Sequence, residues 1–373
     1  MNIHDKDNYL LSQTLGILKK CIVIDFKNGI SVQNLLFHYL SYLIINDYSS
    51  LRLKVIDIKW FQELFLGLED LVLNNFSLIM KYLIDNPKGV NLLTPTERDK
   101  YYFELTEIYC NKVKNLVMNY SGINDLGIMG GVSGYLQILQ RIDPNLKNTS
   151  ISSNVNKFDE ILDDINGADH YKHDISFAHG LPSLLLVLSK DGSYGVRENL
   201  KIASINFINY LLDDKLVSSS LPYWRNASPK AEAMRFTWCH GSYPIICSAI
   251  GLCQELKLEQ SDHSLNRYWH EGNMFDSTQA LAVNDGLCHG YGSSLLFLRL
   301  YPKCIRERYS QTIVEQSIRF IFQKISIEQI RAEKLSEDTI LNGIEGIIYV
   351  LLCMFYHSNS SDSYFCLDLM QNN

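Results

Sequence analysis

The chain lacks the features of several common protein classes. It has no apolar stretch near the roughly 20 residues that a membrane-spanning helix requires. Its formal net charge is −7 and it has no concentrated basic run, so we expect neither nucleic acid nor an anionic membrane surface as a partner. Residues Met1 to Tyr9 are polar and carry both charge signs, which a signal peptide does not. These features predict a cytoplasmic protein.

The cysteines do not form the pattern of a disulfide framework. There are nine, an odd number, and they follow no regular spacing. Several lie inside apolar segments, as Cys247, Cys253 and Cys353 do. This usage indicates reduced thiols, which agrees with a cytoplasmic location.

Strand-like alternation is also scarce, whereas helical periodicity recurs along the chain. Amphipathic helices are predicted over residues 32–46, twice within 60–85, and over 98–120. Two polar stretches, 145–172 and 212–233, are predicted to be loops or insertions. Because no long Pro/Gly/Ser linker or charge block interrupts the pattern, we expect residues 1–373 to form a single domain.

A repeat is visible in the second part of the chain. Five glycines each precede an apolar helical segment, at successive spacings of 49, 61, 49 and 53 residues: Gly131, Gly180, Gly241, Gly290 and Gly343. Each interval also holds a more polar, amphipathic helix. Glycine at such a turn permits either a positive φ or a close approach of two backbone segments. With Gly29 and Gly67 as weaker members, seven helical hairpins would form a solenoid or a closed toroid, with the apolar helices inside.

Two of these turns carry possible metal ligands. The segments are Trp238-Cys239-His240-Gly241 and Leu287-Cys288-His289-Gly290. Zinc prefers thiolate and imidazole ligands, and a catalytic site leaves one position open, so Cys239, Cys288 and His289 are the predicted set. The helix N-terminus that follows each turn also favours a thiolate. Two alternatives stay open: His240 competes as a ligand, or the cysteines are buried thiols without a metal.

Two further residues are candidates for the chemistry. His179 precedes Gly180, so it occupies the position in its turn that matches Cys239 or His289 in the metal-bearing turns. A histidine that titrates near neutrality can transfer protons there, and a packed core histidine is the alternative. Arg235 lies four residues before Cys239, and it is either an active-site group or a surface charge.

The sequence resembles the lanthionine synthetase C family, the cyclases of lanthipeptide biosynthesis. The resemblance covers residues from about 120 to 356 and rests on four motifs: Ala178-His179-Gly180, Arg235 to Gly241, Leu287-Cys288-His289-Gly290, and Gly343 to Tyr349. It implies an α/α toroid with seven inner and seven outer helices. It also implies zinc bound by Cys239, Cys288 and His289, with His179 as the acid/base and Arg235 as the active-site arginine.

One position departs from the family pattern. The family usually carries an aspartate four residues before the first glycine of the Gly131 to Gly134 motif. This chain has Gly127 there, and Asp125 lies two residues out of register. Either a local shift brings Asp125 into the site or the role is unfilled.

The function that the resemblance implies is zinc-dependent addition of peptide cysteine thiols to dehydroalanine or dehydrobutyrine, which forms thioether rings. The expected substrate is a dehydrated precursor peptide. A dehydratase and a transporter of the same pathway are candidate partners, with peripheral attachment to a membrane-associated complex. Two alternatives are the addition of a free thiol such as glutathione to an electrophile, and a non-catalytic docking protein in a peptide-modification complex.

Overall fold

The computed structural model describes residues 95–120, 126–167, 174–213, 237–258 and 344–355, and the single positions 224, 265, 287, 288 and 293. Every regular element in these residues is a helix. The chain divides into two compact units. The second unit holds the described residues up to 265, and the first unit holds those from 287 onward. The prediction of a single domain over 1–373 stays a prediction.

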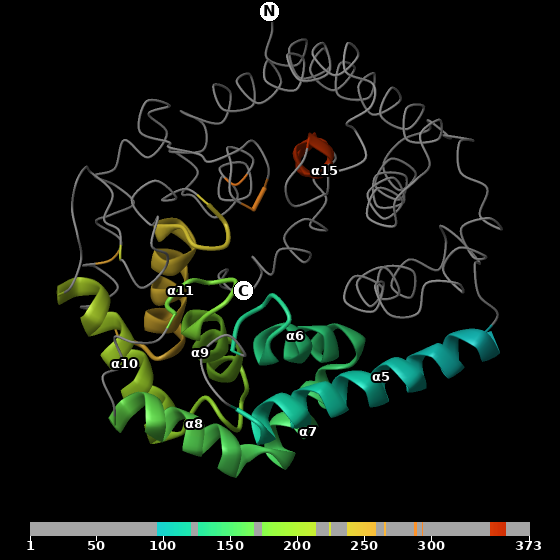
Figure 1. Cartoon of the computed structure of the whole chain (residues 1–373), viewed down its shortest axis with the longest axis horizontal. Coiled ribbons are helices and arrows are strands. Elements are labelled where there is room, and N and C mark those ends of the chain that lie inside the picture. Colours follow the sequence, from blue (N-terminus) through green and yellow to red (C-terminus); the bar gives the residue numbers. More distant parts are fainter. Residues whose placement is uncertain are drawn as a thin grey trace, which may run out of the picture. The chain divides into compact units, whose positions relative to one another are not determined.

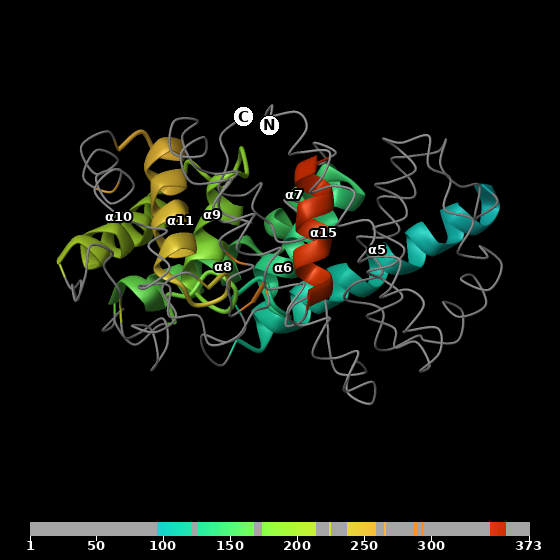
Figure 2. The same cartoon turned by 90° about the horizontal axis from the view of Figure 1, so that it is seen from above.

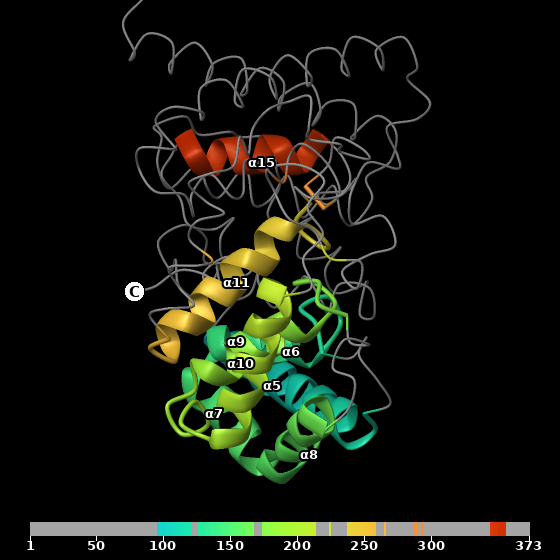
Figure 3. The ribbon, with the colours of Figure 1, turned by 90° about the vertical axis from the view of Figure 1, so that its left-hand side faces the viewer.

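Three helices of the second unit are amphipathic. They are α5 (Pro95–Met118), α8 (Val155–Gly167) and α10 (Glu198–Asp213). Helix α5 buries Tyr109, Val113 and Val117, which are spaced by four and therefore share one face. Helices α8 and α10 pack side by side at the edge of this unit (Figures 1 and 3). The predicted helix over 98–120 is confirmed by α5.

Three other helices follow glycines and are more completely buried. They are α6 (Val132–Ile142), α9 (Leu181–Ser189) and α11 (Ser242–Glu255). All residues from Leu181 to Leu188 of α9 are buried, because α9 packs against α6, α10 and α11 (Figure 1). In the first unit the Gly-led helix is α15 (Ile344–Phe355; Figure 2). It is also apolar, and it is buried from Ile347 to Cys353. The predicted apolar character of the Gly-led helices is therefore confirmed for α9, α11 and α15, whereas α6 is largely buried but amphipathic.

The prediction of a loop over 145–172 is wrong for most of that segment. It contains α7 (Pro144–Ser153) and α8. The side chain of Asp143 accepts a hydrogen bond of 2.9 Å from the backbone N–H of Asn145, which caps α7, and Pro144 stands in its first turn. The Asn, Ser and Asp residues that suggested a loop lie largely on exposed helix faces. The buried stripe of α8 has helical spacing: Phe158, Ile161, Leu162 and Ile165.

Other sequence predictions fall outside the described residues. These are the helices over 32–46 and 60–85, and nearly all of the predicted loop over 212–233. Within the described residues, no helix has both the length and the apolar character to cross a membrane.

The glycine before α9 is required by a close approach of backbone. Its φ is −121°, which any residue can adopt, so a positive φ is not the reason for glycine. A Cβ on Gly180 would come within 3.0 Å of the carbonyl oxygens of Asp174 and Ser176. Of the two explanations for the leading glycines, close approach therefore applies at Gly180.

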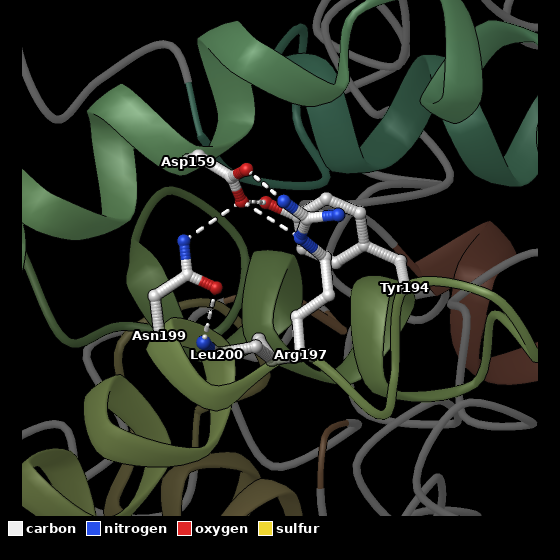
Figure 4. A network of polar contacts seen from close by, with 5 residues as sticks. All are labelled: Asp159, Tyr194, Arg197, Asn199 and Leu200. Carbon is white, nitrogen blue, oxygen red and sulfur yellow. Dashed lines mark hydrogen bonds and ion pairs between the residues drawn. The ribbon is translucent and has the colours of Figure 1, made fainter.

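A polar network joins α8 to the segment that enters α10 (Figure 4). The Oδ1 atom of Asp159 accepts hydrogen bonds from the Tyr194 hydroxyl at 2.8 Å, Arg197 Nε at 3.0 Å and Asn199 Nδ2 at 2.7 Å. Arg197 also forms an ion pair with Oδ2. Partial burial alone would raise the pKa of Asp159, but the hydrogen bonds from Asn199, Tyr194 and Arg197 and the charge of Arg197 lower it below the ordinary 3.8. The ionised carboxylate therefore stabilises the fold.

We expect Asp159→Asn to lower the free energy of unfolding by about 2 kcal/mol at pH 7, because it removes charge-assisted hydrogen bonds from a partly buried group. A carboxylate with a lowered pKa in the folded state stabilises above its unfolded pKa and loses that effect as the pH falls through the folded pKa. The difference between variant and wild type should thus shrink below about pH 4. Chemical denaturation between pH 7 and pH 3 measures it. Asp164→Asn, on an exposed position of the same helix, should change little.

Candidate functional site

The turns before α9 and α11 have the same local structure. In the first, the N–H of Gly180 donates to the carbonyl of Ser176 at 2.9 Å, and in the second the N–H of Gly241 donates to Thr237 at 2.9 Å. Superposing the two turns by these bonds matches Ala178 with Cys239. It also matches His179 with His240. The structure thus places His179 immediately ahead of a buried helix, at the position where the neighbouring turn carries His240.

Backbone hydrogen bonds join three successive turns of the second unit. The carbonyl of Ala178 accepts from the N–H of Met129 at 2.8 Å, and the N–H of Ala178 donates to the carbonyl of Cys239 at 3.3 Å. Ala178 therefore links the turn before α6 to the turn before α11. Because these bonds involve peptide groups only, they fix the backbone immediately before His179.

The two matched histidines touch. The imidazole rings of His179 and His240 are stacked, with centroids 4.9 Å apart and planes inclined by 21°. Both side chains are half-buried. The sequence did not predict this contact, although the equal spacing of Ala178-His179-Gly180 and Cys239-His240-Gly241 was a signal for it.

The thiol of Cys239 lies in a buried part of this turn. Its side chain has no solvent exposure, and Gly241 begins α11 two residues later. Cys247, one and a half turns into α11, is buried as well, and burial raises its thiol pKa well above the usual value. Of the two, Cys239 has the position ahead of a helix N-terminus that favours a thiolate.

The first unit contains a turn with a related feature. Cys288 is 6% exposed, and the preceding carbonyl of Leu287 accepts a hydrogen bond from the hydroxyl of Ser293. In the second unit the carbonyl of Leu126 accepts one from Ser133 in the same manner. Both serines lie near the start of a Gly-led apolar segment. Cys288 therefore occupies a buried turn with the same serine–carbonyl hydrogen bond as the turn before α6.

The predicted metal ligands are only partly described. Cys239 belongs to the second unit and Cys288 to the first, while His289 and Arg235 lie outside the described residues. Within the described residues, no cluster of three His, Cys, Asp or Glu side chains has the arrangement of a metal site. The predicted ligand set therefore stays a prediction. Its chemistry suits zinc, since it would offer two buried cysteine sulfurs and an imidazole.

The structure gives a physical reason for glycine at position 127. A Cβ on Gly127 would lie within 3.0 Å of the carbonyl oxygen of Ala178 and of the Cα and carbonyl carbon of His179. The backbone of the His179 turn therefore occupies the space that any side chain at 127 would need. Asp125, the alternative carboxylate, lies outside the described residues.

Comparison with known proteins agrees with these features. The chain matches the family model described as lanthionine synthetase C-like protein over residues 103–367. Among solved structures it is similar to nisin cyclase, with a TM-score of 0.56 and 17% sequence identity over 91% of this chain and 92% of that one. No curated protein sequence gives a significant match. The structural likeness confirms the predicted fold class, an all-α α/α toroid, while the number of helices stays a prediction. Because the family match spans most of its length, the chain belongs to the lanthionine synthetase C-like protein family.

Proposed function

We propose that the protein is a zinc-dependent lanthipeptide cyclase. It would join cysteine thiols of a dehydrated precursor peptide to dehydroalanine or dehydrobutyrine residues of the same peptide, forming thioether rings. The observation that best supports this function is the bond between Ala178 and Cys239, which holds the turn of an imidazole beside the turn of a buried thiol. The family match and the fold of nisin cyclase support the same class of reaction.

The metal would be held by Cys239, Cys288 and His289. Zinc bound there supplies positive charge that favours the thiolate form of an incoming cysteine, whose ordinary pKa is about 8.5. The burial of Cys239 and Cys288 suits this role, because a dry environment strengthens electrostatic interactions.

The remaining steps fall to the protein's own side chains. A carbon–sulfur bond forms between the peptide thiolate and the β-carbon of the dehydro residue, and the electron pair of the double bond moves to form an enolate. His179 donates a proton to the α-carbon. Arg235 steadies the enolate oxygen or orients His179. The thiol loses one proton and the α-carbon gains one, so no oxidant or reductant is needed. Because both partners belong to one bound peptide, positioning supplies much of the rate.

The test uses a dehydrated peptide with and without its own cysteine. Ring closure is an isomerisation that does not change the mass of the peptide, so it is detected by thiol alkylation. Thiol alkylation followed by mass spectrometry should show the loss of the alkylatable cysteine in the presence of the protein. The free thiol glutathione serves as a competing nucleophile. If the cysteine-free peptide gains glutathione at the same rate as rings close, then the substrate is a free thiol. If neither reaction exceeds the rate without protein, the cyclase proposal is wrong.

A second candidate function is a non-catalytic docking protein of a peptide-modification complex, with the dehydratase and transporter as partners. The observation that favours it is the crowded backbone at Gly127, which leaves no side chain where the family usually carries an aspartate. A docking protein would bind the precursor peptide or its dehydratase and leave the ring-closure rate unchanged. The assay above therefore separates the two functions.

A further inference from the structure

We propose that His240 is a positioning residue for His179, and that its ring fixes the face from which the proton reaches the substrate α-carbon. This inference rests on the proposed cyclase function and assigns His240 a role other than metal ligation. It starts from the stacked contact between the two imidazoles, with centroids 4.9 Å apart and an angle of 21° between their planes.

The stack constrains the orientation of the His179 ring. Offset aromatic pairs at such separations contribute favourable energy beyond simple burial. A ring that lies against another loses freedom to rotate about its side-chain bonds. Since both histidines are half-buried, the contact also covers one face of each imidazole from solvent. A proton delivered by His179 would then come from a ring of fixed orientation.

The backbone around the stack prevents the two rings from drifting apart. Each histidine lies in a turn closed by its own hydrogen bond, Gly180 to Ser176 and Gly241 to Thr237. The bond from Ala178 N–H to the Cys239 carbonyl joins the two turns directly beside the histidines. Separating the rings by a backbone movement would break that bond. Only a side-chain rotation, opposed by the stack, could misalign His179.

The position of His179 matters for the stereochemistry of the product. The enolate formed by thiol addition is planar, and the α-carbon becomes a stereocentre according to the face that receives the proton. A proton donor fixed on one side gives one configuration. A donor that moves, or that is replaced by solvent, gives both. The backbone at Gly127 leaves no room for a carboxylate at that position, whereas the His240 ring of the neighbouring turn lies against His179 and constrains it.

The test compares His240→Ala with His240→Phe, which keeps a stacking ring but offers no proton or metal ligand. In the alanine variant we expect kcat for ring closure to fall roughly 10- to 100-fold with KM nearly unchanged, because small misplacement of a catalytic group costs rate. Chiral chromatography of the hydrolysed product should show both α-carbon configurations. The phenylalanine variant should restore a single configuration and most of the rate, and both variants should retain zinc.

Several outcomes would overturn the proposal. One is a single configuration at wild-type rate in His240→Ala. Another is loss of zinc in both variants, which would make His240 a ligand. A third is failure of the phenylalanine variant to restore selectivity while its zinc and circular dichroism stay normal. The stack is tested without substrate by NMR, since removing the His240 ring should shift the imidazole proton signals of His179. This NMR measurement tests the stack even if the wild-type protein has no cyclase activity. Absence of activity would refute the proposed function, whereas unchanged His179 signals in the variant would refute the stack.

Discussion

Replacing Cys239 with alanine is expected to remove zinc and ring closure together. The site would lose one of three protein ligands, and the imidazole and thiol that remain would bind zinc far more weakly. We expect zinc content to fall below a tenth of stoichiometric, and ring closure to fall at least ~100-fold, because the substrate thiol would stay largely protonated at neutral pH. Elemental analysis of the purified protein and the thiol-alkylation assay measure the two effects on one sample.

Cys247 supplies the matched control for that substitution. It is a buried cysteine in the interior of α11, outside the turn that carries the predicted ligand, and burial raises its thiol pKa above the usual value. Cys247→Ala should therefore cost some stability while zinc content and ring closure stay near wild type. His289→Ala should behave as Cys239→Ala does. Stoichiometric zinc in both the Cys239 and the His289 variants would rule out these ligands.

Replacing Gly127 with alanine is the second substitution for which we expect a large effect. The new Cβ would collide with backbone atoms of Ala178 and His179, which cannot rotate away as a side-chain end can. The turn that holds Met129 against Ala178 must then move, and the hydrogen bond between them is lost. We expect a loss of about 1–3 kcal/mol in the free energy of unfolding, as overpacking gives. Ring closure should fall ~100-fold, because His179 moves with its turn.

Two further variants test whether the lack of space at position 127 or the missing negative charge there limits ring closure. Gly127→Asp supplies the carboxylate that the family usually carries, and we expect it to be at least as harmful as alanine, because it needs the same space. Gly167→Ala, at the end of α8, adds a Cβ that meets no atom within 4 Å, so it should leave activity unchanged. An aspartate variant that closes rings faster than wild type would show that the missing charge, and not the crowded backbone, limits this protein.

Sequence patterns predicted the helices whose burial has a clear period or is complete. The apolar runs of α9 and α11 are examples. Helix α8 was not predicted, because its exposed face carries the polar residues that are typical of loops. Only its four buried positions indicate a helix. Local composition was a weaker signal there than the spacing of apolar residues.

The candidate site was predictable only as a set of residue types. The sequence indicated that Cys239 and His179 lie in equivalent turns, because a glycine that leads an apolar helix follows each of them. The match of His179 with Cys239 was wrong, since the structure matches His179 with His240. The sequence could not indicate that the two turns exchange a backbone hydrogen bond or that His240 stacks on His179, since both depend on the packing of α9 against α11. Nor could it explain Gly127, because the atoms that exclude a side chain there are 51 and 52 residues away along the chain.

The bonds through Ala178 have an evolutionary consequence. They hold the turns together by peptide groups, so these bonds do not depend on which side chains the turns carry. One turn displays a methyl group and an imidazole, and its neighbour displays a thiol and an imidazole on the same backbone path. During evolution, a substitution in one of these turns could therefore add or remove a reactive side chain while the backbone bonds between the turns persist.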